Sequence, residues 1–218
     1  MTAPVRFPNE SDAYRAAREE LLAAEVELRR KVEDVAALRR KLPPGGAVGD
    51  YTFQGADGPV ALVDLFTAGK DTLLLYSYMV SPGKAPCPMC TALLDSLDGT
   101  APHVTQTANL AIAAKAPYAE LATIATARGW RHLRLLSSGG TGFNADYHAE
   151  AGDEQFPMLH VFTKGDDGIR HAWSTELFYA PAEPGQNPRH MDLMFPLWTL
   201  FDTTPGGRPN WFPSLSYD

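Results

Sequence analysis

The sequence predicts an α/β fold, a sandwich in which helices cover a mixed central sheet. Two observations indicate this class: strand-like runs alternate with helical segments between residues 51 and 150, and a hairpin and a last helix follow them. A third observation adds a long helix at the N-terminus, because residues 9–41 contain neither glycine nor proline. At 218 residues, with 44% hydrophobic side chains, the chain can form one sizeable domain with an attached arm.

The expected N-terminal helix has one apolar face. Its apolar residues recur every seven positions, at Leu21, Leu28, Val35 and Leu42. We expect a helix of about 30 residues, roughly 45 Å long, whose first turn is capped by Asn9 or Ser11. The PPGG sequence at 43–46 ends the helix, so the chain is expected to divide into an arm at 1–44 and a domain at 45–218.

The apolar face of the arm leaves two arrangements open. The helix could dock on the chain's own domain, or it could be exchanged with a second subunit, because the heptad spacing persists for barely four repeats. A homodimer through the N-terminal helix is therefore one of the expected partnerships.

The domain from residue 45 onward is expected to hold a series of strands and helices. The first part has a hairpin with strands at 51–53 and 60–62, a helical turn at 62–66, a strand at 72–80 and a helix at 91–97. The middle part has a strand at 109–114, a helix at 118–128 ended by Gly129, a strand at 133–137 and a short helix at 144–150. The last part has a hairpin with strands at 158–163 and 169–174 and a helix at 190–201, broken near Pro196. The apolar run TLLLYSYMV at 72–80 is typical of a central strand that is covered on both faces.

The charge balance argues against nucleic acid as a partner. The 19 basic and 26 acidic residues give a formal net charge of -7, and the basic residues of the arm alternate with acidic ones. No stretch approaches the roughly 18 apolar residues of a membrane span, and the N-terminus shows no apolar signal segment. We therefore expect a cytoplasmic protein without a membrane partner, in a compartment where structural disulfides are rarely maintained.

The motif CPMC contains the only two cysteines of the chain, Cys87 and Cys90. A buried strand leads into a loop, and the pair begins the next helix, with Pro88 in the first turn. At a helix N-terminus the first thiol lies at the positive end of the dipole, so its pKa is expected to be lowered, and the second thiol lies one turn inward. This arrangement predicts a redox dithiol in which Cys87 attacks and Cys90 resolves, with Thr91 and the following amides stabilising the thiolate.

Pro157 is a second candidate site residue. It opens the apolar strand at 158–163, which is followed by a hairpin and a helix, as a proline that faces a dithiol would be placed. An ordinary strand-opening proline would have a trans peptide bond, but the placement resembles that of the cis-proline of thioredoxin-like redox proteins, so we expect a cis bond here and a surface on which substrates dock.

Several segments together resemble a known family. They are FPNES, ALRRKLPPGG, DYTFQG, CPMC, SLDGTAPHVTQTANLA, RGWRHLRLLSS, PGQNPRHMDL and WFPSLSY. They are similar to a bacterial thioredoxin-like family of unknown function, whose members are usually described as predicted dithiol–disulfide oxidoreductases. The resemblance implies a thioredoxin-like three-layer sandwich of the peroxiredoxin-like branch. It implies that Cys87 and Cys90 are the redox residues and that Pro157 is the cis-proline. It does not indicate which substrate is used.

Other functions stay open beside thiol–disulfide exchange. A zinc site would need four ligands, and no pair of histidines has the spacing of a zinc finger, so no metal is expected. A thiol peroxidase of the peroxiredoxin type would use Cys87, with Lys84 lowering its pKa, although the threonine-containing signature of that class is absent. A third alternative is an interaction or oligomerisation module with inert cysteines.

The expected exchange reaction needs no bound cofactor. Its partners would be a protein or small-molecule disulfide and an external thiol reductant. No general acid or base stands out. The histidines and amides at 103–109 and 146–148 are more typical of loop and capping residues, and His160 is expected to be a half-buried, hydrogen-bonded histidine of its strand.

Overall fold

The computed structural model describes residues 5–178, 180–185 and 194–217, and it divides the chain into two compact units, Met1–Pro43 and Pro44–Asp218. The first unit contains one long helix, α1 (Asp12–Arg40). Ser11 caps it by accepting a hydrogen bond from the amide of Tyr14 at 3.1 Å, and Arg39 and Arg40 lie in the last turn, where basic side chains favour the helix dipole. The predicted long N-terminal helix is therefore confirmed.

The start of the first unit is fastened by a buried arginine. Arg15 is 7% exposed, and its guanidinium pairs with the carboxylate of Glu10 at 3.5 Å. The same guanidinium donates a hydrogen bond to the carbonyl of Val5. These contacts hold the segment before α1 against the first turns of the helix.

The second unit is built on a mixed sheet of seven strands. Its strands are β1 (Thr52–Gly55), β2 (Gly58–Ala61), β3 (Thr72–Ser77), β4 (Asn109–Ala114), β5 (Leu135–Ser137), β8 (Met158–Gly165) and β9 (Gly168–Ser174). Their order across the sheet is β2-β1-β5-β4-β3-β8-β9. Neighbours β3, β4 and β5 are parallel, whereas the remaining pairs are antiparallel. Two further strands, β6 (Glu150–Ala151) and β7 (Glu154–Gln155), form a small separate hairpin.

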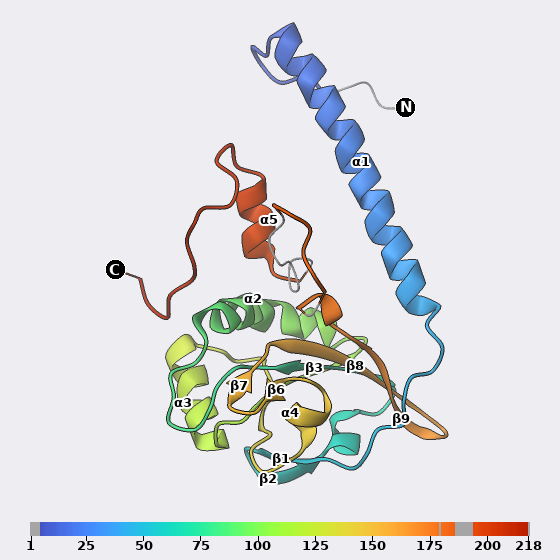
Figure 1. Ribbon diagram of the computed structural model, residues 1–218, viewed down its shortest axis with the longest axis vertical. Helices are drawn as coiled ribbons and strands as arrows, with labels where there is room; N and C mark the ends of the chain where they lie inside the picture. Colours follow the sequence, from blue (N-terminus) through green and yellow to red (C-terminus); the bar gives the residue numbers. More distant parts are fainter. Residues whose placement is uncertain (1–4, 179, 186–193, 218) are drawn as a thin grey trace. The chain divides into compact units, whose positions relative to one another are not determined.

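Helices lie on both faces of this sheet, as Figure 1 shows. The helical segments of this unit are α2 (Pro88–Val104), α3 (Tyr118–Arg128), α4 (Phe143–Asp146), α5 (Pro196–Asp202) and the short 3-10 turns η1 (Leu62–Leu65) and η2 (Glu176–Phe178), and α5 lies beyond α2 and not on the sheet. No described helix is long and apolar enough to cross a lipid bilayer.

Alternation along β3 divides the core into two halves. Tyr76 points into the core under α2 and α3, whereas Leu73 and Leu75 point into the core that contains η1 and α4. Phe53, Phe143 and Phe162 belong to the second core, and each is 0% exposed. The predicted fold class is thus confirmed: an α/β, thioredoxin-like three-layer sandwich with a mixed central sheet.

One buried amide fixes where β3 begins. Asn109 is 5% exposed at the start of β4, and its Oδ1 accepts hydrogen bonds from the amide and the hydroxyl of Thr67 at 3.0 and 2.8 Å. Its Nδ2 donates to the carbonyl of Thr72 at 2.9 Å. The side chain therefore ties the connection before β3 to the first residue of β4, and it sets the register in which Leu73 pairs with Asn109.

Some predicted elements differ from the structure. Helix α2 continues to Val104 instead of ending at residue 97, although Pro102 lies within it. The strand predicted at 133–137 covers only 135–137, and the helix predicted at 144–150 is the single turn of α4, followed by the unpredicted β6–β7 hairpin. The first residues of the helix predicted at 190–201 lie outside the described part, and α5 begins at Pro196.

Candidate dithiol site

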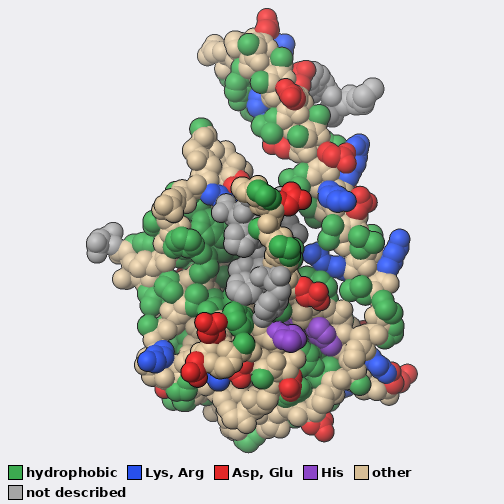
Figure 2. All heavy atoms as spheres, viewed as in Figure 1, with side chains coloured by type: hydrophobic (Ala, Val, Ile, Leu, Met, Phe, Trp, Pro, Cys, Tyr) green, Lys and Arg blue, Asp and Glu red, His purple; other side chains and the backbone are tan. Residues whose placement is uncertain are grey.

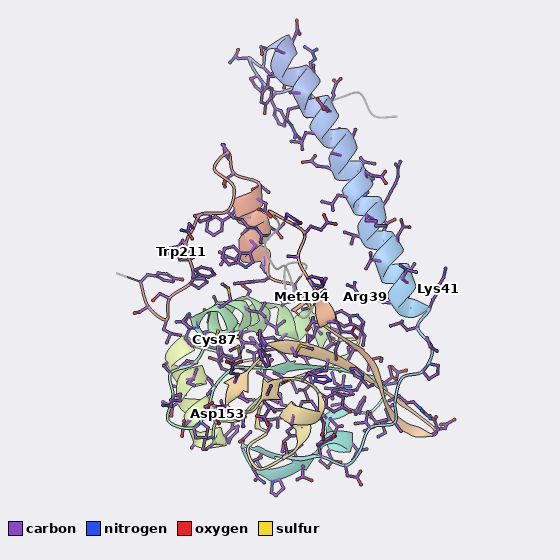
Figure 3. The ribbon with its side chains drawn as sticks, viewed as in Figure 1. Arg39, Lys41, Cys87, Asp153, Met194 and Trp211 are labelled. Carbon is purple, nitrogen blue, oxygen red and sulfur yellow. The ribbon has the colours of Figure 1, made fainter. Side chains whose placement is uncertain are left out.

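The first cysteine caps the helix that follows the central strand. Cys87 is the N-cap of α2, with extended backbone angles (φ -61°, ψ 121°), and Pro88 occupies the first turn. Its amide donates to the carbonyl of Met79 at 3.1 Å, so the loop that leaves β3 holds the cysteine at the helix start. Figure 3 shows Cys87 at this end of α2. Proline is suited to this position because the amide it lacks would have no partner within the helix.

The second cysteine lies one turn inward, in the core. Cys90 is 2% exposed and packs with Tyr76 and Leu94, whereas Cys87 is only partly buried. Both thiols are free. The first sulfur is therefore more accessible than the second, as predicted from the sequence.

The two thiols have opposite pKa shifts. The pKa of Cys87 is lowered to about 6, first because the Cys90 thiol donates a hydrogen bond to its sulfur and further because the amides of Cys90 and Met89 point at it; partial burial acts in the other direction. Among the described residues, Lys84 is not one of the groups that lower this pKa. The pKa of Cys90 is raised, because its proton is held by Cys87 and because burial disfavours a thiolate.

A tyrosine that the sequence analysis did not single out contacts the buried thiol. Tyr76 is 1% exposed, and its hydroxyl hydrogen-bonds to Cys90, which favours the Cys90 thiolate against the stronger raising effects. Burial raises the pKa of Tyr76 itself well above its usual value, and the charge of Cys90 adds to this. Tyr76 therefore keeps its proton and can donate it to the Cys90 sulfur. Alternation along the strand predicted at 72–80 could have identified it, because residues 74, 76 and 78 share the face that meets the helix.

Thr91 does not act as predicted. Its hydroxyl donates to the carbonyl of Cys87 at 2.9 Å and lies 2.7 Å from the hydroxyl of Tyr78, so it is directed away from the sulfur. Because the Thr91 hydroxyl donates its one proton to the Cys87 carbonyl, the Tyr78 hydroxyl is the donor in the hydrogen bond between Tyr78 and Thr91. The amides that stabilise the Cys87 thiolate are those of Met89 and Cys90. Thr91 instead locks the first turn of α2 to the segment after β3.

The expected cis bond before Pro157 is wrong. None of the described peptide bonds is cis, and Pro157 is buried immediately before β8. The amide of Phe156 donates to the carbonyl of Ala149 at 2.9 Å, so the unpredicted β6–β7 hairpin fixes the approach to this proline. Strand pairing does place Pro157 near the end of β3, since Met158 pairs with Ser77. Its part in substrate docking stays a prediction.

A polar cluster connects α2 with α3 behind the dithiol. The carboxylate of Asp95 accepts hydrogen bonds from Arg128 and, at 2.8 Å, from the indole of Trp130. The ring of Trp130 packs edge-on against Tyr78, with centroids 6.0 Å apart. These contacts brace the helix that carries both cysteines.

The histidine candidates lie elsewhere. His160 is 0% exposed and pairs with Leu75, so it faces the core opposite Tyr76. Its Nδ1 lies 2.7 Å from the Ser174 hydroxyl, which also contacts His171 at 2.6 Å. Burial lowers the pKa of His160 to about 3, with His171 and His148 adding to the effect. It is more deeply buried than predicted, and it is not part of the dithiol site.

The remaining polar candidates are structural. Asn109 is at the opposite end of the sheet strands from the dithiol, and Tyr147 packs on His160 and Phe162 in the second core. No three His, Cys, Asp or Glu side chains among the described residues are grouped as metal ligands.

Comparison with known proteins places the chain in a family. The family described as "Bacterial protein of unknown function (DUF899)" matches residues 4–216. The chain belongs to this family. The resemblance inferred from the sequence is confirmed by this match. Among curated proteins, no sequence matches the chain.

Solved structures similar to this chain are distant. Peroxidoxin BcpB from Mycobacterium tuberculosis is 16% identical, with a TM-score of 0.47 over 71% of this chain and 94% of its own. A mutant of peroxiredoxin Q from Xanthomonas campestris is 11% identical, with a TM-score of 0.45 over 68% and 90%. An exposed lipoprotein thioredoxin of Streptococcus pneumoniae is 14% identical, with a TM-score of 0.43 over 67% and 98%. At these levels, function has to be inferred from the chain's own residues.

Proposed function

We propose that this protein catalyses thiol–disulfide exchange through Cys87 and Cys90. The observation that carries the proposal is the arrangement of the two cysteines: Cys87 is partly exposed at the start of the helix, and Cys90 is buried one turn away, where it lowers the pKa of Cys87. The lowered pKa of Cys87 makes it a thiolate at neutral pH, which is the form that attacks disulfides.

The exchange proceeds in two balanced steps. The Cys87 thiolate attacks one sulfur of a substrate disulfide, forms a mixed disulfide and releases the other substrate sulfur as a thiolate. Cys90 then loses its proton, attacks the Cys87 sulfur and releases the second substrate thiolate, leaving a Cys87–Cys90 disulfide. The Tyr76 hydroxyl supports the second step, because it donates a hydrogen bond to the Cys90 sulfur as its negative charge develops.

An external thiol reductant restores the dithiol, and the protein needs no cofactor of its own for either step. A reducing compartment such as the cytoplasm would supply that reductant.

Peroxide reduction is the second candidate, because the same low-pKa thiolate could form a sulfenic acid that Cys90 resolves. It ranks second because the lowered pKa comes from Cys90 and the helix amides, and no charged side chain of the described residues is among its causes.

A direct test measures reduction of insulin and of glutathione disulfide by the full chain, beside consumption of hydrogen peroxide. We expect turnover of a disulfide by the wild type and none by Cys87→Ser. In the Cys90→Ser variant the reaction should stop after the first attack. The mixed disulfide at Cys87 should then accumulate and be visible by mass spectrometry.

The same assays separate the alternatives. Peroxide consumption that depends on Cys87, without disulfide turnover, would assign the peroxidase function instead. Equal, negligible rates for the wild type and Cys87→Ser in every assay would leave the protein as a module with inert cysteines.

A further inference from the structure

Helix α1 presents an apolar row that no described residue of its own unit covers. The row is made of Leu21, Leu28, Val35 and, just after the helix, Leu42, and its three leucines are 48%, 64% and 51% exposed. They recur at heptad spacing along a helix of 29 residues, about 43 Å at 1.5 Å per residue. Leucines in a continuous row on a helix this long are typical of a surface that is buried by a partner.

The charges of the same helix are separated by sign. Between Glu10 and Glu27 there are six carboxylates and two basic groups, whereas between Arg29 and Lys41 there are six basic groups and two carboxylates. The sign of the charges changes at Leu28, which is itself a residue of the heptad row. Figure 2 shows the basic side chains of α1 gathered mostly along its C-terminal half, and Figure 3 labels Arg39 and Lys41 at that end.

We propose that α1 pairs with α1 of a second copy of this chain in antiparallel orientation, centred on Leu28. In this orientation the acidic half of each helix faces the basic half of the other, and the two helix dipoles oppose each other favourably. A parallel pair would place acid against acid and base against base. The charge pattern therefore selects both the partner and its direction.

The register follows from the centre. With Leu28 opposite its own copy, Leu21 faces Val35, which is an apolar pair, and the flanking Glu25 faces Lys31, which is a pair of opposite charge. The charges of α1 and its flanks balance, eight acidic against eight basic between residues 10 and 41, which gives an anionic membrane or nucleic acid no net attraction. A second copy is the one partner that carries the complementary pattern by necessity. This inference is independent of the proposed exchange reaction.

The first test determines the mass of the full chain by sedimentation and by light scattering, over a range of protein concentrations. We expect a dimer for the wild type and a monomer for Leu28→Glu. Ala23→Glu is the matched control, since it adds the same charge at an exposed position on the other side of the helix, and it should remain dimeric. Circular dichroism and Cys87 alkylation check that both variants are folded. A monomeric wild type, or a Leu28→Glu variant that stays dimeric, overturns the proposal.

The second test determines the orientation. In the double variant Glu20→Lys/Glu27→Lys the acidic half becomes neutral. An antiparallel dimer loses attraction at both ends, so its dissociation constant should rise by about tenfold or more. A parallel dimer would instead lose repulsion and bind more tightly. An unchanged or lower dissociation constant overturns the antiparallel arrangement.

Discussion

The hydrogen bond from Cys90 to Cys87 can be removed by one substitution, Cys90→Ala. In the wild type the pKa of Cys87 is about 6, so about half of it is thiolate at pH 6 and about 90% at pH 7. A hydrogen bond to a charged acceptor contributes about 1.5–3 kcal/mol, and one pKa unit corresponds to about 1.4 kcal/mol. Because Cys87 is partly open to water, we take the lower limit, which moves its pKa up by about one unit.

The shift has a defined sign. The pKa of Cys87 is lowered, so the thiolate is lost as the pH falls through about 6 in the wild type and through about 7 in Cys90→Ala. At pH 6 the variant should therefore react with iodoacetamide about fivefold more slowly, whereas at pH 9 the two rates should agree.

The assay follows alkylation of the Cys87 peptide by mass spectrometry from pH 4.5 to pH 9.5. Cys90→Ser is the matched control, because its hydroxyl can still donate to the sulfur and should keep the midpoint nearer to 6. A wild-type midpoint above 8 would refute the arrangement of donors around Cys87. Equal midpoints in the wild type and Cys90→Ala would show that the Cys90 thiol is not the main cause.

Three other substitutions test the surroundings of the site. Tyr76→Phe removes the donor to Cys90 and should slow release of glutathione from a Cys87 mixed disulfide by about tenfold or more, with Cys87 alkylation unchanged; equal release rates would contradict its role. Asp95→Asn weakens the contacts between α2 and α3 and should lower the free energy of unfolding in urea by about 1–3 kcal/mol, and a smaller loss would show that the cluster is not stabilising. Gly129→Ala forces a side chain into a left-handed residue (φ 73°) and should cost about 1–2 kcal/mol in the same measurement. Gly99→Ala inside α2, where an added Cβ has open space, is its control and should not destabilise.

Elements with strong local signals were predictable in detail. The strand at 109–114 and the helix at 118–128 have the predicted bounds. The helix ends where it does because Gly129 adopts the left-handed conformation that glycine tolerates, and Pro117 precedes its first turn. Ser11 caps α1 as expected, because a serine side chain can satisfy an amide of the first turn.

Elements that depend on distant contacts were not predictable. Gly99 and Pro102 indicate a helix end near residue 98, yet α2 continues to Val104. The carboxylate of Asp98 accepts the amides of Arg131, His132 and Leu133 at 2.9, 2.8 and 3.2 Å, so this part of α2 is fixed by a loop more than thirty residues away. The same contacts hold residues 131–133 in the loop, so Leu133 is not part of β5.

The site was predictable in its sulfurs and not in their partners. The spacing of Cys87 and Cys90 and the strand before them are local, so their positions at the start of α2 followed from the sequence. The bond from Tyr76 to Cys90 depends on which face of β3 meets α2, and the trans bond at Pro157 accompanies a short hairpin with no distinctive sequence. Both depend on tertiary packing that the local pattern does not specify.

The side chain of Asn109 gives this protein an uneven tolerance to insertions and deletions. One residue gained or lost between Thr67 and Thr72 would shift β3 by one position, and either Leu75 or Ser77 would then replace Tyr76 under α2. Length changes in the loop at 81–86 leave that alignment intact, because they come after the strand. Relatives that keep the tyrosine should therefore vary in length after β3 and hold the preceding connection constant.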